Sequence, residues 1–122
     1  STIQETMTAK VGVLRSATGI QSARVVLAGL ATDHATPTTA AWETTNLATI
    51  SAALAAAAEL RCETRGSHWR EDFPERNDAS WAGHIDACVQ TEPELVFHPA
   101  PPTDQPAPPD QLAPPSITGG PR

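Results

Sequence analysis

Hydrophobic residues recur at helical spacing near the start of the chain. Successive apolar residues are separated by four, four and three positions, which places them on one face of a helix: Ile3, Met7, Val11 and Leu14. The pattern predicts a helix over residues 3–14. The order Ser1-Thr2-Ile3-Gln4 in front of it is typical of a capping box, which opens a helix. A chain that begins at a helix cap is expected to be the C-terminal part of a longer protein.

Two further helices are predicted downstream. One covers residues 19–30 and opens on the capping pattern Thr18-x-x-Gln21. Its inward-facing residues are expected to be Ile20, Ala23, Val26, Leu27 and Leu30. Residues 31–45 hold six threonines and a proline, so we expect a loop there. The other helix is predicted over residues 45–65, because seven alanines between positions 48 and 58 favour helix.

The third helix is the longest, and it is expected to complete the fold. The side chains expected to face the core are Leu47, Ile50, Leu54, Ala57 and Ala58. Gly66 is expected to stop the helix, since glycine readily takes the left-handed conformation found after helix ends. Three helices joined by loops predict an all-α fold, a small antiparallel three-helix bundle.

The composition of the sequence changes after the third predicted helix. Residues 67–78 are dense in charge and lack an apolar period, so we expect an ordered polar loop lying on the bundle. Residues 84–89 and 94–97 are expected to pair as a short β-hairpin around a turn at 91–93. Nine of the twelve prolines lie from Pro99 onward, where there is little to bury. The expected organisation is a helical domain over residues 1–98 and a disordered Pro-rich tail over residues 99–122.

Charge and cysteine content exclude several classes of protein. The net charge is −6 with a single lysine, which argues against a nucleic-acid partner, because binding phosphates requires clustered basic residues. No apolar run approaches the ~20 residues that span a bilayer, so no membrane partner is expected. Two cysteines are too few for a disulfide framework, which favours a reducing compartment such as the cytoplasm.

The candidate site residues lie directly after the third helix. They are Glu63, Arg65, His68, Arg70, Asp72 and Arg76. In one interpretation, their ion pairs only fix the path of a polar loop. In the other, Arg65, His68 and Arg70 line a surface that binds a carboxylate or docks another domain, since guanidinium groups match carboxylates in shape and charge.

A metal site is a weaker alternative. Cys62, His68, His84 and Cys88 offer two sulfur and two nitrogen ligands of the kind zinc binds, but their spacing matches no compact zinc module. The sequence shows no nucleophile elbow and no phosphate-binding glycine loop. The residues therefore contain no complete active site of their own.

A longer motif carries a family resemblance. Residues 63–76 read Glu-Thr-Arg-Gly-Ser-His-Trp-Arg-Glu-Asp-Phe-Pro-Glu-Arg and are followed by Trp81. This run resembles the C-terminal helical domain of the flavoprotein family that contains L-aspartate oxidase and the succinate dehydrogenase and fumarate reductase flavoprotein subunits. Residues 3–15 and 46–61 are similar to helices of that domain, so the resemblance covers residues 3–85. Thr64 departs from it, because the family more often has serine there.

The resemblance implies a larger FAD-dependent oxidoreductase. FAD would be bound by an upstream domain, and this segment would pack on the FAD-binding and capping domains. The family's flavin-binding glycines and substrate-binding residues lie upstream, so the resemblance assigns no catalytic, cofactor-binding or metal residue here. It makes the candidate residues of the Arg65–Arg76 loop a domain-docking set.

Two features point to different branches of the family. The acidic Pro-rich tail favours L-aspartate oxidase, which converts L-aspartate to iminoaspartate for NAD biosynthesis. The run from Arg76 through Trp81 to His84 is closer to the succinate dehydrogenase pattern, which implies contact with an iron–sulfur subunit. A free-standing helical interaction module is a third hypothesis.

Overall fold

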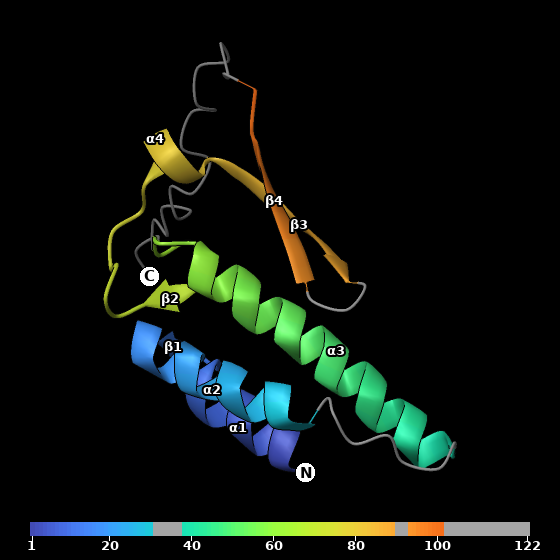
Figure 1. Cartoon of the computed structure of the whole chain (residues 1–122). Helices are drawn as coiled ribbons and strands as arrows, with labels where there is room; N and C mark the ends of the chain where they lie inside the picture. The colour runs from blue at the N-terminus through green and yellow to red at the C-terminus, as the bar shows by residue number, and fades with distance from the viewer. Residues whose placement is uncertain (31–37, 90–92, 102–122) are drawn as a thin grey trace, which may run out of the picture.

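The computed structural model describes residues 1–30, 38–89 and 93–101. Its elements follow the chain in the order α1 (Thr2–Lys10), β1 (Leu14–Arg15), α2 (Ala17–Leu30), α3 (Thr39–Leu60), β2 (Trp69–Arg70), α4 (Asp78–Trp81), β3 (Gly83–Val89) and β4 (Pro93–Pro99). Helix α3 lies between two layers, with α1 and α2 on one side and the β3–β4 hairpin on the other (Figure 1). The predicted tail lies outside the described residues from position 102 onward.

The all-α prediction is wrong, because the chain forms two small sheets. Strands β1 and β2 pair in parallel, with Leu14 opposite Trp69. Strands β3 and β4 pair antiparallel over their full length, from Gly83 opposite Pro99 to Val89 opposite Pro93. The alternating residues at 84–89 and 94–97 do form a hairpin, and its predicted turn at 91–93 falls largely outside the described residues.

The first two helices differ from their predicted bounds. Helix α1 ends at Lys10 instead of residue 14, and the chain then becomes extended in β1. Gly12 permits this exit, since a Cβ there would lie 2.4 Å from the Thr8 carbonyl oxygen. Helix α2 begins at Ala17, two residues before the predicted start, because Ser16 Oγ accepts a hydrogen bond from the Gly19 N–H at 3.2 Å.

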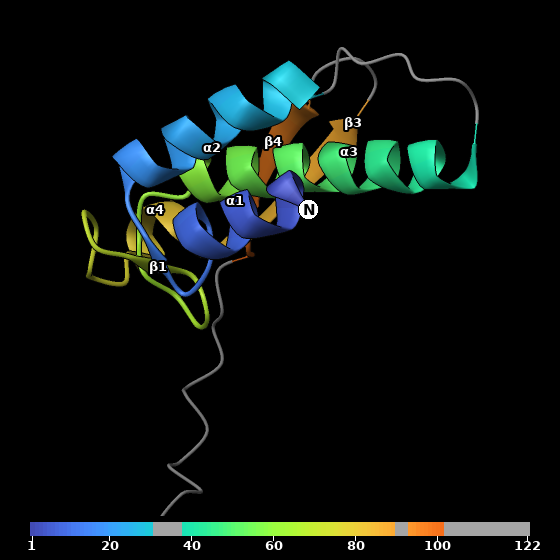
Figure 2. The same cartoon turned by 90° about the horizontal axis from the view of Figure 1, so that it is seen from below.

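Helix α3 begins earlier and ends earlier than predicted. Thr38 caps its first turn, since Thr38 Oγ1 accepts a hydrogen bond from the Ala41 N–H at 3.1 Å. Residues 39–45, predicted as loop, are therefore helical. The first turns of α3 project beyond α1 and α2 (Figure 2), and Trp42 in them is 64% exposed. The helix ends at Leu60, so Gly66 does not terminate it.

The face that α3 turns to the core is made of small residues. The predicted stripe is wrong at its large residues, because Ile50 is 60% and Leu54 is 56% exposed. The buried residues of α3 are Ala48, Ser51, Ala55, Ala56 and Ala58. They let the backbone of α3 approach Ile20 and Leu27 of α2, which are fully buried. Among the described helices, none is long and apolar enough to cross a membrane.

This packing predicts that Ala55 cannot be enlarged. Ala55 has no exposed surface, so Ala55→Leu forces extra methylene groups into the α2–α3 contact. We expect a loss of about 1–3 kcal/mol in the free energy of unfolding, measured by chemical denaturation. The control Ala40→Leu places the same side chain on an exposed position of α3 and should change stability by less than about 0.5 kcal/mol. Equal effects of the two substitutions would contradict the assigned face.

Candidate functional site

A buried carboxylate organises the start of the loop after α3. Glu63 is fully buried, and its oxygens accept hydrogen bonds from Arg61 Nη1 at 2.6 Å and Arg65 Nε at 2.7 Å. The backbone N–H of Asn77 donates to the same carboxylate at 2.8 Å. Burial alone would raise the pKa of Glu63, but the hydrogen bonds from Arg65, Asn77 and Arg61 outweigh it and lower the pKa to about 2. Glu63 therefore holds two arginines and the far end of the loop together.

Arg70 caps the C-terminal end of α3. The whole residue is 1% exposed, and its Nη1 donates to the carbonyls of Ala58 at 2.7 Å and Glu59 at 3.1 Å. Those carbonyls lie in the last turn of the helix, where no intrahelical donor reaches them and where a cation is favoured. Arg70 therefore satisfies the helix end from outside the helix.

Asp72 completes the arrangement around Arg70. Its two carboxylate oxygens accept from Arg70 Nε at 2.8 Å and Nη2 at 2.7 Å, and this forked pair lowers the pKa of Asp72 to about 2. One of the same oxygens accepts from the Ala17 N–H at 3.1 Å, which ties the loop to the start of α2. The Arg70 guanidinium also lies 5.0 Å from the centre of the Phe73 ring.

His68 connects the loop to the segment after α1. Arg15 Nη1 donates to His68 Nδ1 at 2.7 Å, so the ring proton resides on Nε2 and is donated to the Arg61 carbonyl at 3.0 Å. Burial lowers the pKa of His68; the hydrogen bond to the Arg61 carbonyl opposes this shift, and the nearby charges of Arg15 and Arg70 add to it. The ring is therefore held neutral, with both nitrogens engaged.

The remaining candidates, Arg65 and Arg76, share one exposed partner. Both guanidinium groups pair with the carboxylate of Asp78 at the start of α4. Between Arg65 and His68 the chain reverses through two backbone hydrogen bonds of 2.9 Å. Gly66 makes the reversal with φ +56°, a conformation that favours glycine. All six predicted residues thus lie in one polar network: Glu63, Arg65, His68, Arg70, Asp72 and Arg76.

The hydrogen bonds within the network restrict the chemistry that its side chains can perform. The guanidinium groups of Arg65 and Arg70 face acceptors within the chain, and His68 has both ring nitrogens bonded. A substrate carboxylate would have to displace Glu63 or Asp72 to reach them. The geometry therefore favours a role in holding the loop over the carboxylate-binding alternative, and domain docking stays a prediction. Sequence reasoning missed two partners, Arg15 and Arg61.

An open cleft of about 370 Å³ adjoins the network between α1, α3 and β3. Apolar side chains of all three elements line it, among them Met7, Leu54 and Ile85. Arg15 is also part of its lining, but its Nε donates to the Val11 carbonyl at 2.9 Å. The cleft therefore offers mainly apolar contact.

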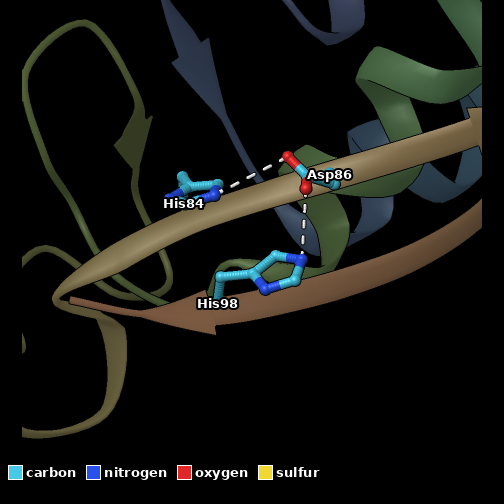
Figure 3. Close-up of side chains that lie close together, drawn as sticks. All are labelled: His84, Asp86 and His98. Atoms are coloured by element: carbon cyan, nitrogen blue, oxygen red, sulfur yellow. Dashed lines mark ion pairs between the residues drawn. The ribbon is translucent and has the colours of Figure 1, made fainter. Parts of the chain in front are cut away.

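The four ligands of the proposed zinc site are not brought together. Within the described part of the chain, the group that could hold a metal ion is His84, Asp86 and His98. These three side chains lie close together on the hairpin (Figure 3). Of the three, His84 was a predicted ligand, whereas Asp86 and His98 were not. Cys62 instead lies near the end of α3, where its thiol donates to the Glu59 carbonyl at 3.8 Å.

Comparison with known proteins gives consistent relatives. The sequence model of a family described as fumarate reductase flavoprotein C-term matches residues 1–112. An L-aspartate oxidase of Streptomyces coelicolor is 38% identical over 107 residues, which cover 80% of this chain and 18% of that protein. A succinate dehydrogenase flavoprotein subunit of Coxiella burnetii is 48% identical over 44 residues, covering 36% of this chain and 8% of that protein.

Solved structures show the same relationship. Mycobacterium smegmatis Sdh1 in complex with UQ1 matches with a TM-score of 0.58 and 26% identity, over 77% of this chain and 18% of that one. The apo form of the Sdh1 complex matches with the same score over 78% of this chain. The chain thus spans less than a fifth of the length of these relatives.

The network predicts a large effect from Glu63→Gln. Glutamine cannot neutralise Arg61 and Arg65, which are 13% and 27% exposed. We expect the free energy of unfolding at neutral pH to fall by about 3 kcal/mol, the lower end of the range for a broken buried ion pair. The folded-state pKa of Glu63, about 2, lies below its unfolded value of ~4.3. Its contribution is therefore complete above pH ~4.3 and is lost as the pH falls toward 2.

Denaturant titrations at a series of pH values measure both effects. Between pH ~4.3 and 2, the Glu63→Gln protein should lose less stability than the parent chain. Glu71→Gln is the matched control, since Glu71 is an exposed residue of the same loop and should leave both quantities nearly unchanged. Similar losses in the two variants would show that Glu63 does not organise the loop.

Proposed function

Since the chain belongs to the family of fumarate reductase flavoprotein C-terminal domains, we propose that it is the accessory C-terminal domain of an FAD-dependent L-aspartate oxidase. The observation that carries the proposal is the 38% identity to an L-aspartate oxidase over 80% of this chain. The whole enzyme would oxidise L-aspartate to iminoaspartate, reduce its flavin and supply NAD biosynthesis. It would act in the cytoplasm, without a nucleic-acid or membrane partner.

In this proposal, FAD is bound by another domain of the same enzyme. The polar network supports that division, because its arginines are neutralised by Glu63, Asp72 and Asp78 of the chain itself. A flavin pyrophosphate would need free cationic or backbone donors at this place. The domain instead contributes a surface that packs on the FAD-binding and capping domains.

The loop presents apolar side chains outward. Trp69 is 50% exposed, and its register partner Leu14 is 57% exposed. Phe73 on the same loop is 40% exposed. Leaving such side chains in water forgoes ~25 cal/mol for each Å² of apolar surface. Since the chain spans 18% of the Streptomyces coelicolor L-aspartate oxidase, the rest of the enzyme is expected to cover these side chains.

This surface gives the candidate residues a defined part in docking. Arg70 and Glu63 are buried, so they support the loop from inside and are not themselves the contact. Trp69, Leu14 and Phe73 are the side chains that would touch the FAD-binding domain. Docking therefore combines an ionic frame with an apolar outer surface.

A second candidate function rests on separate observations. The matches to the Coxiella burnetii subunit and to Mycobacterium smegmatis Sdh1 support a succinate dehydrogenase flavoprotein subunit. In that case, the surface next to the docking loop would also contact an iron–sulfur subunit. The two candidates predict different substrates for the same flavin.

The flavoprotein that carries this domain is expected to be yellow and to produce hydrogen peroxide on addition of L-aspartate. The visible spectrum detects the flavin, and a coupled peroxidase assay follows the reaction. Dye-linked oxidation of succinate without oxidation of aspartate would support the second candidate instead. A colourless protein inactive with both substrates would contradict both.

The docking surface is tested by Trp69→Ser in that flavoprotein. Losing the exposed half of an indole at the interface should weaken docking by about 1–2 kcal/mol, seen as a lower melting temperature and lower flavin occupancy. The control Val25→Ser removes a side chain that is 70% exposed on α2, away from the loop. Wild-type melting temperature and flavin content in Trp69→Ser would argue against docking through the loop.

A further inference from the structure

The solvent-facing side of the β3–β4 hairpin carries, at one end, three side chains of the kinds that can bind a metal ion. His84 and Asp86 come from β3, and His98 comes from β4 (Figure 3). His84 and His98 are direct cross-strand partners, and Asp86 lies two residues along the same strand. Because side chains alternate across a strand, all three project from one face of the hairpin.

The distances between their ligand atoms are close to those of a metal site. Asp86 Oδ2 lies 3.1 Å from His98 Nε2, and Asp86 Oδ1 lies 3.8 Å from His84 Nε2. Two ligand atoms of a tetrahedral zinc ion are ~3.3 Å apart, given zinc–ligand distances of ~2.0–2.1 Å. All three ligand atoms lie within 4.8 Å of one another, so small rotations of the side chains would let them converge.

We propose that His84, Asp86 and His98 bind one divalent transition-metal ion of the zinc type. Two imidazoles and one carboxylate suit such ions, whereas calcium and magnesium prefer oxygen ligands alone. Three protein ligands leave a coordination position for water or for a further group. The site differs from the sulfur-containing set considered from the sequence and shares only His84 with it.

The hairpin backbone fixes the positions from which these side chains project before an ion binds. Gly83 has φ +156°, and a Cβ there would lie 2.1 Å from the His98 carbonyl oxygen, so the two strands approach closely at this end. On the opposite face of the hairpin, Phe97 packs edge-on against Trp81 with ring centres 5.2 Å apart. The three proposed ligands therefore lie at the end of a sheet that is supported by packing on its other face, and not on a loop.

The imidazoles are oriented but still accessible. The rings of His84 and His98 stack with centres 5.1 Å apart and planes 20° from parallel. Their side chains are 70% and 46% exposed, and that of Asp86 is 66% exposed, so a hydrated ion can enter and the rings can turn. A surface ion pair alone contributes little to stability. A bound ion would join the first residues of β3 to the last residues of β4.

The site is tested by titrating the 122-residue chain, with its cysteines kept reduced, with zinc chloride and measuring binding by calorimetry. We expect one ion to bind per chain, and magnesium chloride to give no binding. Mutating a residue that only hydrogen-bonds to a metal ligand lowers metal affinity by about 10–100-fold. Losing a direct ligand in His84→Ala or His98→Ala should therefore weaken zinc binding at least about tenfold. Asp86→Asn should weaken it in the same direction. Circular dichroism verifies that each variant keeps its fold.

Matched variants and ring signals locate the ion. Glu94→Gln and Cys88→Ser change exposed residues on the same face of the hairpin and should leave the affinity unchanged. In NMR spectra, zinc should shift the ring signals of His84 and His98 but not those of His68, whose nitrogens are both bonded. Absence of stoichiometric binding, unchanged affinity in both histidine variants, or loss of binding in Cys88→Ser would each overturn the proposal.

Discussion

The buried guanidinium of Arg70 at the C-terminal end of α3 is the contact on which the rest of the domain depends. The last carbonyls of a helix have no partner inside it, and here Arg70 donates to those of Ala58 and Glu59. A buried cation must itself be neutralised, and Asp72 does so with both oxygens. Because Asp72 also accepts from the Ala17 N–H, one ion pair joins the end of α3, the loop and the start of α2.

From this contact the network extends to the other layer of the fold. Arg61 shares the carboxylate of Glu63 with Arg65, and its guanidinium also donates to the carbonyls of Trp81 and Gly83, each at 2.9 Å. Those carbonyls lie at the end of α4 and the start of β3. A domain with a core of mostly small side chains has little apolar burial to position a hairpin. Charged hydrogen bonds therefore supply much of the geometry between the layers.

The sequence predicted some of this well and some of it poorly, for identifiable reasons. The six candidate residues do gather, because they lie within fourteen positions of each other after one helix. Arg15 was missed because it contacts His68 across 53 positions, a distance no local pattern encodes. The predicted inward face of α3 was also wrong at its large residues. That helix is apolar on nearly every side from Leu47 to Ala58, so periodicity could not select a face, and the close approach of α2 selected the alanines instead.

The face that α3 buries also explains why the domain has the exposed apolar surface expected of part of a larger protein. If the alanines of α3 pack inward, its larger side chains must point away, and Ile50 and Leu54 are more than half exposed. Leu54 lines the cleft with Met7 of α1 and Ile85 of β3, so the exposed apolar surface is continuous across three elements. A monomer gains nothing from showing such surface to water. The packing that makes α3 a close neighbour of α2 thus leaves an apolar surface beside the loop that the ionic network holds in place, and in the proposed flavoprotein another domain would cover it.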